Sequence, residues 1–457
     1  MGDRRENSMT DIDTNKPQVG ISREKAAEPE LGQRPIDGFR YNSTDFAALE
    51  WEQMWTKVWL VAGRVDQLTQ PGDYITVSIG SESILCSMGS DNKIHAFYNV
   101  CQHRGNLLVP AEIGSLNGGD FTCAYHGWRY DNNGTLVWVH CEEDFPQGNP
   151  CGKRNLLEIP CDIWGGFIWI NMDSECEDLL DYLSPVSEHL DCYQMEQMKR
   201  THWITLEGNF NWKVVQDNFN ESYHLPFVHP QTVTVMNEHY SGCQFDMYPA
   251  GHCRMLMPGG GPGPQYKGSY EKTFQGLKED FAFWEFDPSP FKDDLSALRV
   301  ALQKHKREVG ADKGYDFSLY SDEQLTDHYH YTVFPNVSFS MKPDGCIFLM
   351  AYPHPDNPKK CFFNMWYLTK FPKGATEYYS NSMRDWVSID QQVEHETGKV
   401  GEISCGHGID QDVAIWSSQQ QGLSSRGYKG EYMPYQERRI RFFHENIDRY
   451  LSSNFDK

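Results

Sequence analysis

Four potential metal ligands, arranged as two mixed cysteine–histidine pairs, place the strongest constraint on how this chain can fold. One residue separates Cys101 from His103, two residues separate Cys123 from His126, and nineteen residues lie between the pairs. The surrounding residues, 72–172, consist of short, alternating, β-branched segments separated by Gly, Ser, Asp and Asn. This pattern predicts strands joined by tight turns. Two loops of a small all-β domain must therefore come together, each contributing one thiolate and one imidazole to a shared site.

Such a mixed ligand set is typical of a Rieske [2Fe–2S] centre, in which two thiolates hold one iron and two neutral imidazoles hold the other. A Cys2His2 zinc site uses the same ligand types, but zinc fingers usually group cysteine with cysteine and histidine with histidine. A respiratory Rieske protein would have a membrane anchor and a disulfide between its cluster loops. The residues next to the ligands are Gln102, Arg104, Ala124 and Tyr125, none of them cysteine. We therefore predict that the four ligands hold a [2Fe–2S] cluster of the oxygenase type.

A second group of ligand residues follows about 100 residues later. The segment DNFNESYHLPFVH contains Glu221, His224 and His229 in a stretch that is predicted to be helical. On a helix, Glu221 and His224 share a face. Pro226 predicts a distortion just after His224, which brings His229 back towards the same metal. An H-x4-H spacing alone is a weak signal, but in this context it predicts two imidazole ligands of a mononuclear iron. With one carboxylate they leave positions open for dioxygen and substrate.

The segments CQHRG, CAYHGWRYD and NFNESYHLPFVHP resemble the cluster loops and the iron-ligand segment of Rieske ring-hydroxylating oxygenases. The resemblance extends from about Phe46 to about Ser425. It implies an α+β fold, with an all-β Rieske domain and a helix-grip catalytic domain in which helices cover an antiparallel sheet. We expect a mobile N-terminal arm at 1–35, a Rieske domain with a preceding helix at 36–172, and a catalytic domain at 173–457.

The same resemblance implies roles for further residues. The carboxylate ligand lies at the start of a C-terminal helix, where Asp412 is the predicted ligand and Asp410 the predicted N-cap; capping is the alternative role for Asp412. Glu221 is the acidic residue through which electrons pass from the cluster of a neighbouring subunit. Many aromatic-ring dioxygenases have Asp at this position, whereas Glu is familiar in branches that include quaternary-amine monooxygenases. Asp217 and Asn218 are adjacent candidates for shaping this route, with helix solvation or local hydrogen bonding as the alternative.

Hydrophobic periodicity predicts the remaining elements. The predicted helices lie at 45–58, 206–224, 275–309, 375–396, 410–421 and 434–451. Strands of the catalytic domain are predicted at 331–341, 346–353 and 359–371. The glycine- and proline-rich run at 258–268 is predicted to be a loop or lid. Trp416, one turn after the predicted carboxylate ligand, is expected either to line the pocket or to lie in the core.

Composition limits the partners. The chain has 41 Lys and Arg against 64 Asp and Glu, a net charge of −23, which disfavours binding to nucleic acid or to an anionic membrane. No segment approaches the roughly 18 consecutive apolar residues of a membrane span, and the polar N-terminus lacks the apolar core of a secretory signal. We expect a cytoplasmic protein whose 13 cysteines are reduced thiols or metal ligands.

Together the two sites predict the terminal component of an oxygenase that uses dioxygen to hydroxylate or dihydroxylate an aromatic substrate. Electrons from NAD(P)H would arrive through a separate reductase, with or without a ferredoxin, because the chain has no glycine-rich dinucleotide fingerprint between a strand and a helix. The alternatives are a Rieske monooxygenase or demethylase acting on an amine, ether or quaternary ammonium substrate, and a non-catalytic Rieske electron carrier. The resemblance also implies a homotrimer or a multiple of three, with or without a small β subunit. Arg254, His330 and Lys342 are possible partners of a substrate carboxylate.

Overall fold

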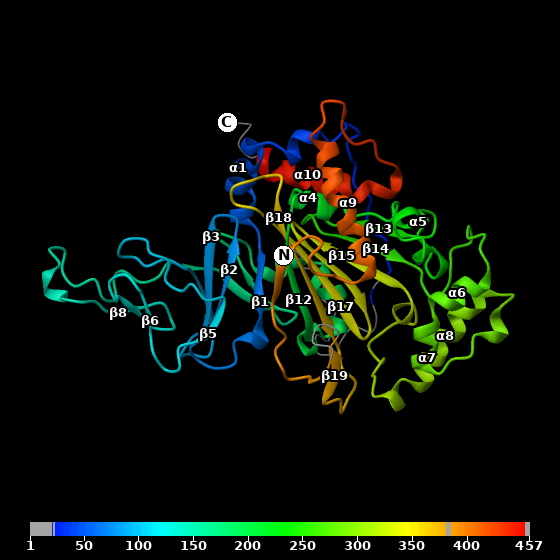
Figure 1. The fold of residues 1–457 in the computed structure, drawn as a ribbon, viewed down its shortest axis with the longest axis horizontal. Coiled ribbons are helices and arrows are strands. Elements are labelled where there is room, and N and C mark those ends of the chain that lie inside the picture. The colour runs from blue at the N-terminus through cyan, green and yellow to red at the C-terminus, as the bar shows by residue number, and fades with distance from the viewer. Residues whose placement is uncertain (1–20, 22, 381–384, 453–457) are drawn as a thin grey trace, which may run out of the picture.

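The computed structural model describes residue 21, residues 23–380 and residues 385–452, which form a β-rich lobe and a larger lobe of helices around a long sheet (Figure 1). This is the expected α+β architecture. The start of the predicted arm, residues 1–20 and residue 22, lies outside the described part.

The described part of the N-terminal segment differs from the predicted mobile arm. The backbone N–H of Ala26 donates to Asp246 at 2.9 Å, and the guanidinium of Arg438 donates to Glu28 at 2.8 Å. A short polar segment cannot fold alone, because it buries too little apolar surface. Here its polar groups find partners on the long sheet and on the last helix, and residues 23–35 therefore pack against the larger lobe.

The β-rich lobe contains three small sheets, with the strand orders β5-β2-β3-β4-β9, β6-β7-β8 and β1-β11-β10. Its alternating segments form antiparallel strands with tight turns, as predicted. The strands are β1 (Leu60–Arg64), β2 (Asp73–Ile79), β3 (Glu82–Met88), β4 (Ile94–Tyr98), β5 (Ile113–Ser115), β6 (Phe121–Thr122), β7 (Arg129–Tyr130), β8 (Leu136–Trp138), β9 (Glu158–Ile159), β10 (Cys161–Trp164) and β11 (Phe167–Ile170).

The larger lobe is organised around an eight-stranded sheet with the order β13-β14-β15-β16-β17-β18-β12-β21. Its described pairings are antiparallel, except that β21 runs parallel to β12 at one edge. The β-branched and aromatic runs predicted as strands supply its centre. The strands are β12 (Lys199–Gly208), β13 (Gln244–Met247), β14 (Cys253–Met257), β15 (His328–Val333), β16 (Val337–Lys342), β17 (Gly345–Pro353), β18 (Cys361–Thr369) and β21 (Glu396–Lys399).

Helices pack on this sheet and around its edges (Figure 1). The first predicted helix and the last two are confirmed, with small shifts at their ends. None of the described helices is long and apolar enough to cross a membrane. The helices are α1 (Thr44–Gln53), α2 (Leu179–Leu183), α3 (Val186–Leu190), α4 (Trp212–Phe219), α5 (Leu225–Val228), α6 (Tyr270–Gly276), α7 (Lys278–Trp284), α8 (Leu295–Val309), α9 (His407–Leu423) and α10 (Arg438–Ser452).

The helix predicted at 206–224 is shorter and begins later than expected. Leu206 belongs to β12, where it pairs with Phe363 of β18, and only α4 is helical. The Asn211 side chain starts α4 by accepting a backbone N–H of the first turn, and Asn220 follows its last residue. Asparagine side chains compete with helical hydrogen bonds and favour helix ends, so the two asparagines limit the helix.

Two further helix predictions need correction. The helix predicted at 375–396 is wrong. Its described residues include the paired strands β19 (Glu377–Ser380) and β20 (Asp385–Ser388), and residues 381–384 lie outside the described part. Aromatic and β-branched residues in this segment favour strands. The predicted helix at 275–309 is divided into α7 and α8 by a turn that contains two prolines, which a regular helix does not accommodate.

An ion pair with almost no exposure joins α1 to α4. The Lys213 ammonium lies 2.7 and 3.0 Å from the two carboxylate oxygens of Glu50, and the side chains are 0% and 2% exposed. Burial raises the pKa of Glu50 and lowers that of Lys213, while each partner opposes the shift of the other. Each charge depends on its partner, because water does not reach either of them.

We expect Glu50→Ala to lower the free energy of unfolding by about 3–5 kcal/mol, because it leaves the buried Lys213 ammonium unpaired. Chemical denaturation measures the change. The control is Lys25→Ala, which removes an exposed pair with Glu28 and should change stability by less than about 1 kcal/mol. Similar small effects in both variants would contradict the importance of the buried pair.

Candidate metal centres

Two similar loops carry the four cluster ligands predicted from the sequence. Cys101 lies in the loop after β4, and Cys123 directly follows β6. The N–H of Gly105 donates to the carbonyl of Cys101 at 3.0 Å, and the N–H of Gly127 donates to the carbonyl of Cys123 at 2.9 Å. Both glycines have positive φ, +73° and +70°, a conformation that glycine adopts without steric cost. The two loops therefore turn back in the same way after their cysteines.

The four side chains meet between these loops. The imidazoles of His103 and His126 have ring centroids 4.6 Å apart. Burial raises the pKa of the Cys101 thiol, and the neighbouring Cys123 raises it further. The Nδ1 atom of His103 is buried and has no hydrogen-bond partner among the described residues. Two free thiols and two imidazoles, one with an unpartnered ring nitrogen, fit the donor set of a Rieske cluster.

Two aromatic residues that were not predicted from the sequence support this group. The Tyr130 hydroxyl accepts the backbone N–H of Gln102 at 3.0 Å and lies 3.4 Å from Cys101 Sγ. Its proton is therefore free to point at the sulfur, and hydrogen bonds to cluster sulfurs tune the reduction potential. Trp128 stacks on His103 with an interplanar angle of 10°. In the sequence, their position directly after the second ligand pair could have identified these two residues.

The three predicted iron ligands, His224, His229 and Asp412, also lie together. One ligand atom from each lies within 4.8 Å of the others. The Nε2 atoms of His229 and His224 are 2.8 and 3.5 Å from Asp412 Oδ1. His229 and Asp412 are buried. Two imidazoles and one carboxylate converging in this way are the donor set that suits a non-haem iron with open coordination positions.

The second ring nitrogen of each histidine has its own partner. The Nδ1 atom of His224 contacts Glu221 Oε1, and the Nδ1 atom of His229 lies 2.9 Å from Gln411 Oε1. Both acceptors are oxygens, so each Nδ1 carries a proton, and Nε2, on the side of Asp412, is the nitrogen available to a metal. Sequence reasoning missed Gln411, although it directly precedes the predicted carboxylate ligand.

The backbone around Glu221 differs from the prediction. Because α4 ends at Phe219, Glu221 and His224 do not share a helical face. Instead, Glu221 Oε2 accepts the backbone N–H groups of Tyr223 and, at 3.1 Å, His224. The predicted distortion just after His224 is replaced by α5, which begins at Leu225 with Pro226 as its second residue, since proline is tolerated in the first helical turn. The Glu221 carboxylate therefore orients His224 through both its ring and its backbone.

The predicted N-cap at Asp410 is wrong, because α9 already begins at His407. Asp410 lies in the first turn of α9. Its carboxylate accepts the backbone N–H of Cys405 at 2.7 Å, which fixes the turn that leads into α9. Trp416 is fully buried, and its ring centroid lies 5.1 Å from that of Phe363 on β18. Of its two expected positions, Trp416 therefore occupies the core.

Asp217 and Asn218 are not part of the ligand group. Asp217 is buried, accepts the Tyr41 hydroxyl at 2.6 Å and lies 3.1 Å from His444 Nε2. The amide nitrogen of Asn218 is buried without a hydrogen-bond partner among the described residues. The proposed influence of these residues on electron transfer stays a prediction.

The three side chains considered for a substrate carboxylate have different surroundings. Arg254 forms a buried ion pair with Asp246 at 2.8 Å and is not free for a substrate. Lys342 is exposed at the end of β16. His330 is buried on β15, where its Nδ1 lies 3.0 Å from Ser340 Oγ and its Nε2 has no hydrogen-bond partner among the described residues.

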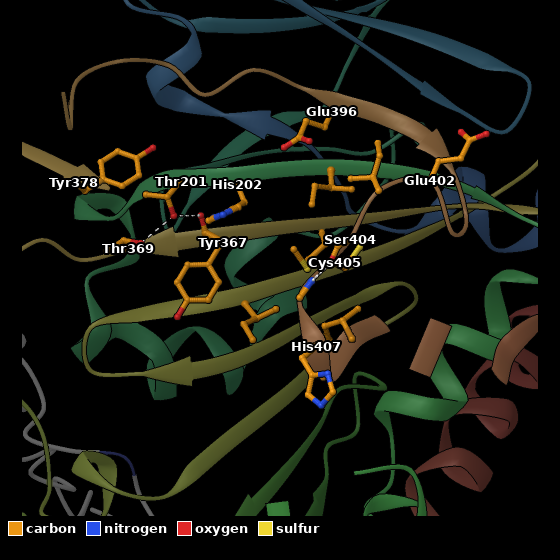
Figure 2. Close-up of a pocket in the computed structure, with 17 residues that line it drawn as sticks. Thr201, His202, Tyr367, Thr369, Tyr378, Glu396, Glu402, Ser404, Cys405 and His407 are labelled. Carbon is orange, nitrogen blue, oxygen red and sulfur yellow. Dashed lines mark hydrogen bonds between the residues drawn. The ribbon is translucent and has the colours of Figure 1, made fainter. Parts of the chain in front are cut away.

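A cavity of about 960 Å³ lies between the sheet and the segment that leads into α9 (Figure 2). Strands β12, β17 and β18 form one wall, with His202 and Tyr367 among its side chains, and residues 402–409 form the other. The carboxylates of Glu396 and Glu402 lie at its edge, and the described lining residues include neither Lys nor Arg. The second wall continues into α9, the helix that carries Asp412, although none of the three candidate iron ligands lines the cavity.

Comparison with known families gives one match in each of the two lobes of the chain. Residues 195–453 match the family described as ring hydroxylating alpha subunit (catalytic domain). Residues 58–149 match the family described as Rieske [2Fe-2S] domain.

Individual relatives act on two kinds of substrate. The glycine betaine monooxygenase oxygenase subunit of Chromohalobacter salexigens is 29% identical over 44% of each chain; the chain thus aligns with less than half of that relative's length. The chloroplastic choline monooxygenase of Spinacia oleracea is 25% identical over 91% of this chain and 78% of its own length. The large oxygenase component of the naphthalene 1,2-dioxygenase system of a Ralstonia species is 29% identical over 63% of this chain and 62% of its own length.

Solved structures share the fold. A quaternary ammonium Rieske monooxygenase superposes with a TM-score of 0.66 at 18% identity, covering 94% of this chain and 99% of the other. A naphthalene 1,2-dioxygenase with bound indole superposes with a TM-score of 0.63 at 19% identity, covering 92% and 93%.

Loss of the Gln411 amide should weaken the candidate iron site without removing a ligand. We expect Gln411→Leu to lower the affinity for ferrous ion about 10- to 100-fold, because the His229 ring loses the partner that fixes its tautomer and orientation. Metal titration of the apoprotein measures the affinity. Gln231→Leu is the control, since Gln231 bonds to Gln411 at 2.7 Å but not to the imidazole. An unchanged affinity in Gln411→Leu would contradict the orienting role.

Proposed function

The chain belongs to the family of ring-hydroxylating oxygenase alpha subunits with a Rieske [2Fe–2S] domain, and from this we propose that it is the terminal oxygenase of a multicomponent, cytoplasmic system. One observation carries the proposal: a cysteine–histidine cluster site and a separate two-histidine, one-carboxylate site occur in the same chain. The first donor set suits an electron relay and the second suits dioxygen chemistry.

We assign each site residue by its donor atom. The proposed cluster ligands are Cys101, His103, Cys123 and His126, and the proposed iron ligands are His224, His229 and Asp412. When bound, the iron supplies the site at which dioxygen is reduced. Around it, Glu221 and Gln411 hold the imidazole rings so that both Nε2 atoms face one point. Burial of this group keeps the reacting region apart from bulk water.

The two sites lie far apart within one chain. The β6–β8 sheet beside the cluster loops is at one end of the longest axis, and α5 and α9 are in the other lobe (Figure 1). We therefore propose that electrons cross between subunits, from the cluster of one chain to the iron of the next, with Glu221 between them. Head-to-tail contacts of this kind close into rings, which supports a homotrimer or a multiple of three. A separate reductase, with or without a ferredoxin, would reduce the cluster; a small β subunit is compatible with this assembly.

The proposed reaction is hydroxylation or dihydroxylation of an aromatic substrate, the activity for which the naphthalene dioxygenase relative is named. A second candidate is a quaternary ammonium or other amine substrate. The cavity at the start of α9 favours it, because Glu396, Glu402 and Tyr367 offer negative charge and an aromatic ring to a cation. The glycine betaine and choline monooxygenase relatives support the same candidate.

Labelled dioxygen separates these functions. Purified enzyme, a matched reductase and a panel of aromatic and quaternary ammonium compounds would be incubated with ¹⁸O₂, and the products analysed by mass spectrometry. Two labelled atoms in one product indicate dihydroxylation of an arene. One labelled atom indicates a monooxygenase, with aldehyde release if the substrate is demethylated. If the cluster is reduced but no compound gains label, the electron-carrier alternative stands and the oxygenase proposal fails.

Asp412→Ala tests the assignment of the iron carboxylate. We expect the variant to lose the mononuclear iron and turnover but to keep the cluster absorbance, because the cluster loops are in the other lobe. Iron analysis should therefore fall from three to two irons per chain. Asp410→Ala is the control on the same helix and should keep three. Full activity of Asp412→Ala would refute the ligand assignment.

Mixed oligomers test electron transfer between subunits. Asp412→Ala lacks the iron site, and Cys123→Ser lacks the cluster, so each variant alone should be inactive. Co-expression with two different affinity tags should yield mixed oligomers that regain part of the wild-type turnover, because one chain supplies the cluster and its neighbour the iron. Inactive mixed oligomers with full metal content would contradict the proposed route.

A further inference from the structure

A buried polar cluster behind the iron-ligand segment has no role in the chemistry described so far. The Tyr41 hydroxyl lies 2.6 Å from Asp217 Oδ2, 2.8 Å from Glu431 Oε1 and 3.0 Å from His444 Nε2. The same histidine nitrogen lies 3.1 Å from Asp217 Oδ1. Tyr41, Asp217 and His444 are 0%, 4% and 1% exposed. Glu431 is half-buried. Three regions far apart in the sequence thus bring two carboxyl groups to one hydroxyl.

The hydrogen bonds determine how many protons this cluster holds. The Tyr41 hydroxyl has one proton and can donate to only one of the two carboxyl groups. Its contact with the other is a hydrogen bond only if that carboxyl brings a proton of its own. Otherwise oxygen lone pairs of Tyr41 and a carboxylate would face each other away from water, which is costly. One of the two carboxyl groups is therefore protonated.

His444 indicates which carboxyl group is ionised. Burial lowers the pKa of His444 to about 3, so the ring is neutral and has one N–H. Its Nδ1 is buried without a partner among the described residues, and a proton there would be an unpaired buried donor. The proton is therefore on Nε2, within hydrogen-bond distance of both Asp217 Oδ1 and the Tyr41 oxygen. Asp217 then accepts from both His444 and Tyr41, which suits a carboxylate, and Glu431 carries the extra proton.

The charges around the cluster support this proton count. Burial raises the pKa of Asp217 to about 7, and Tyr41, Lys213 and Arg40 oppose the rise. Burial also raises the pKa of Glu431 to about 7, with a further contribution from Asp217. Further charged groups act on the cluster: Glu221 on Asp217, Arg441 on Glu431 and Asp448 on His444. Asp217 and Glu431 in turn raise the pKa values of Tyr428 and Glu437.

A half-buried carboxyl group, Glu437, interacts electrostatically with the cluster. Burial raises the pKa of Glu437 to about 8, and Glu221, Glu431 and Asp217 raise it further. Glu437 is thus electrostatically coupled to Asp217, to Glu431 and to Glu221, the residue that orients His224.

We propose that Tyr41, Asp217, Glu431 and His444 form a buried proton store that serves the oxygenase reaction; this rests on the function proposed above. Inserting one atom of dioxygen into a C–H bond consumes two electrons and two protons and releases one water, and cis-dihydroxylation of an arene consumes the same electrons and protons. The reductase supplies the electrons. The store supplies one of the two protons when the O–H bond of Glu431 breaks and leaves a carboxylate, and water supplies the other. A proton from water, entering past Glu437, restores the acid.

Infrared spectroscopy of the holoenzyme tests the store without turnover. At neutral pH the wild-type protein should show the C=O band of a protonated carboxyl group, shifted in D₂O. Because burial also raises the pKa of Glu437 to about 8, the variants are compared in a Glu437→Gln background, in which Glu431→Gln and Asp217→Asn should each lose this band. The control Glu445→Gln, on the same helix as His444 but outside the cluster, should keep it. Absence of the band in the wild type, or its persistence in both cluster variants, would overturn the proposal.

Turnover then separates a proton store from a purely structural cluster. Relative to wild type, Glu431→Gln should lower turnover at saturating substrate on the order of 100-fold, with a larger solvent isotope effect. Its iron content and cluster spectrum should be unchanged. Tyr41→Phe, which removes only the bridging hydroxyl, should lower turnover and raise the solvent isotope effect in the same way. Wild-type turnover and isotope effect in a variant that lacks the band would overturn the proposal. If the wild type labels no substrate, the proposed function fails, whereas the infrared result still decides whether the proton is stored.

Discussion

An aromatic contact between two helices and one strand determines where the chemistry can take place. Phe219 at the end of α4, Trp416 on α9 and Phe363 on β18 have ring centroids 5.1–6.5 Å apart. Aromatic rings in edge-to-face contact have a preferred geometry as well as a large buried area. This contact places the end of α4 next to α9. The proximity of His224 and Asp412 is a consequence of that placement. The sheet therefore acts as a fixed reference for ligands that are far apart in the sequence.

Behind the ligands, polar groups form hydrogen bonds and ion pairs with other protein groups and not with solvent. Each imidazole of the iron site has an oxygen on its Nδ1, and α4 is tied to α1 through Lys213 and Glu50. In the interior an unpaired charge or donor is costly, so these groups permit few alternative arrangements. The same property lets Asp217 stay close to a second acidic group: the two share a proton and avoid the repulsion of two charges.

Local motifs made much of this predictable. The cysteine–histidine pairs and the segment from Glu221 to His229 are each encoded within a few residues, and the contrast between alternating and helical periodicity indicated the α+β fold. The helix at 206–224 was wrong because asparagines at 211 and 220 limit it, a competition that hydrophobic spacing does not reveal. Gln411 was missed although it is adjacent to Asp412, because its role depends on His229, which is 182 residues away.

The continuity between the cavity wall at 402–409 and α9 has a consequence for protein engineering. Substitutions that reshape this wall act on the same stretch of backbone that sets the position of Asp412, so selectivity and metal occupancy will change together. Strands β17 and β18 contribute the opposite wall from a sheet whose register is fixed over nine residue pairs. Side chains such as Ile347 and Tyr367 are therefore the better positions for directed evolution of substrate range, because they can vary while the metal stays in place.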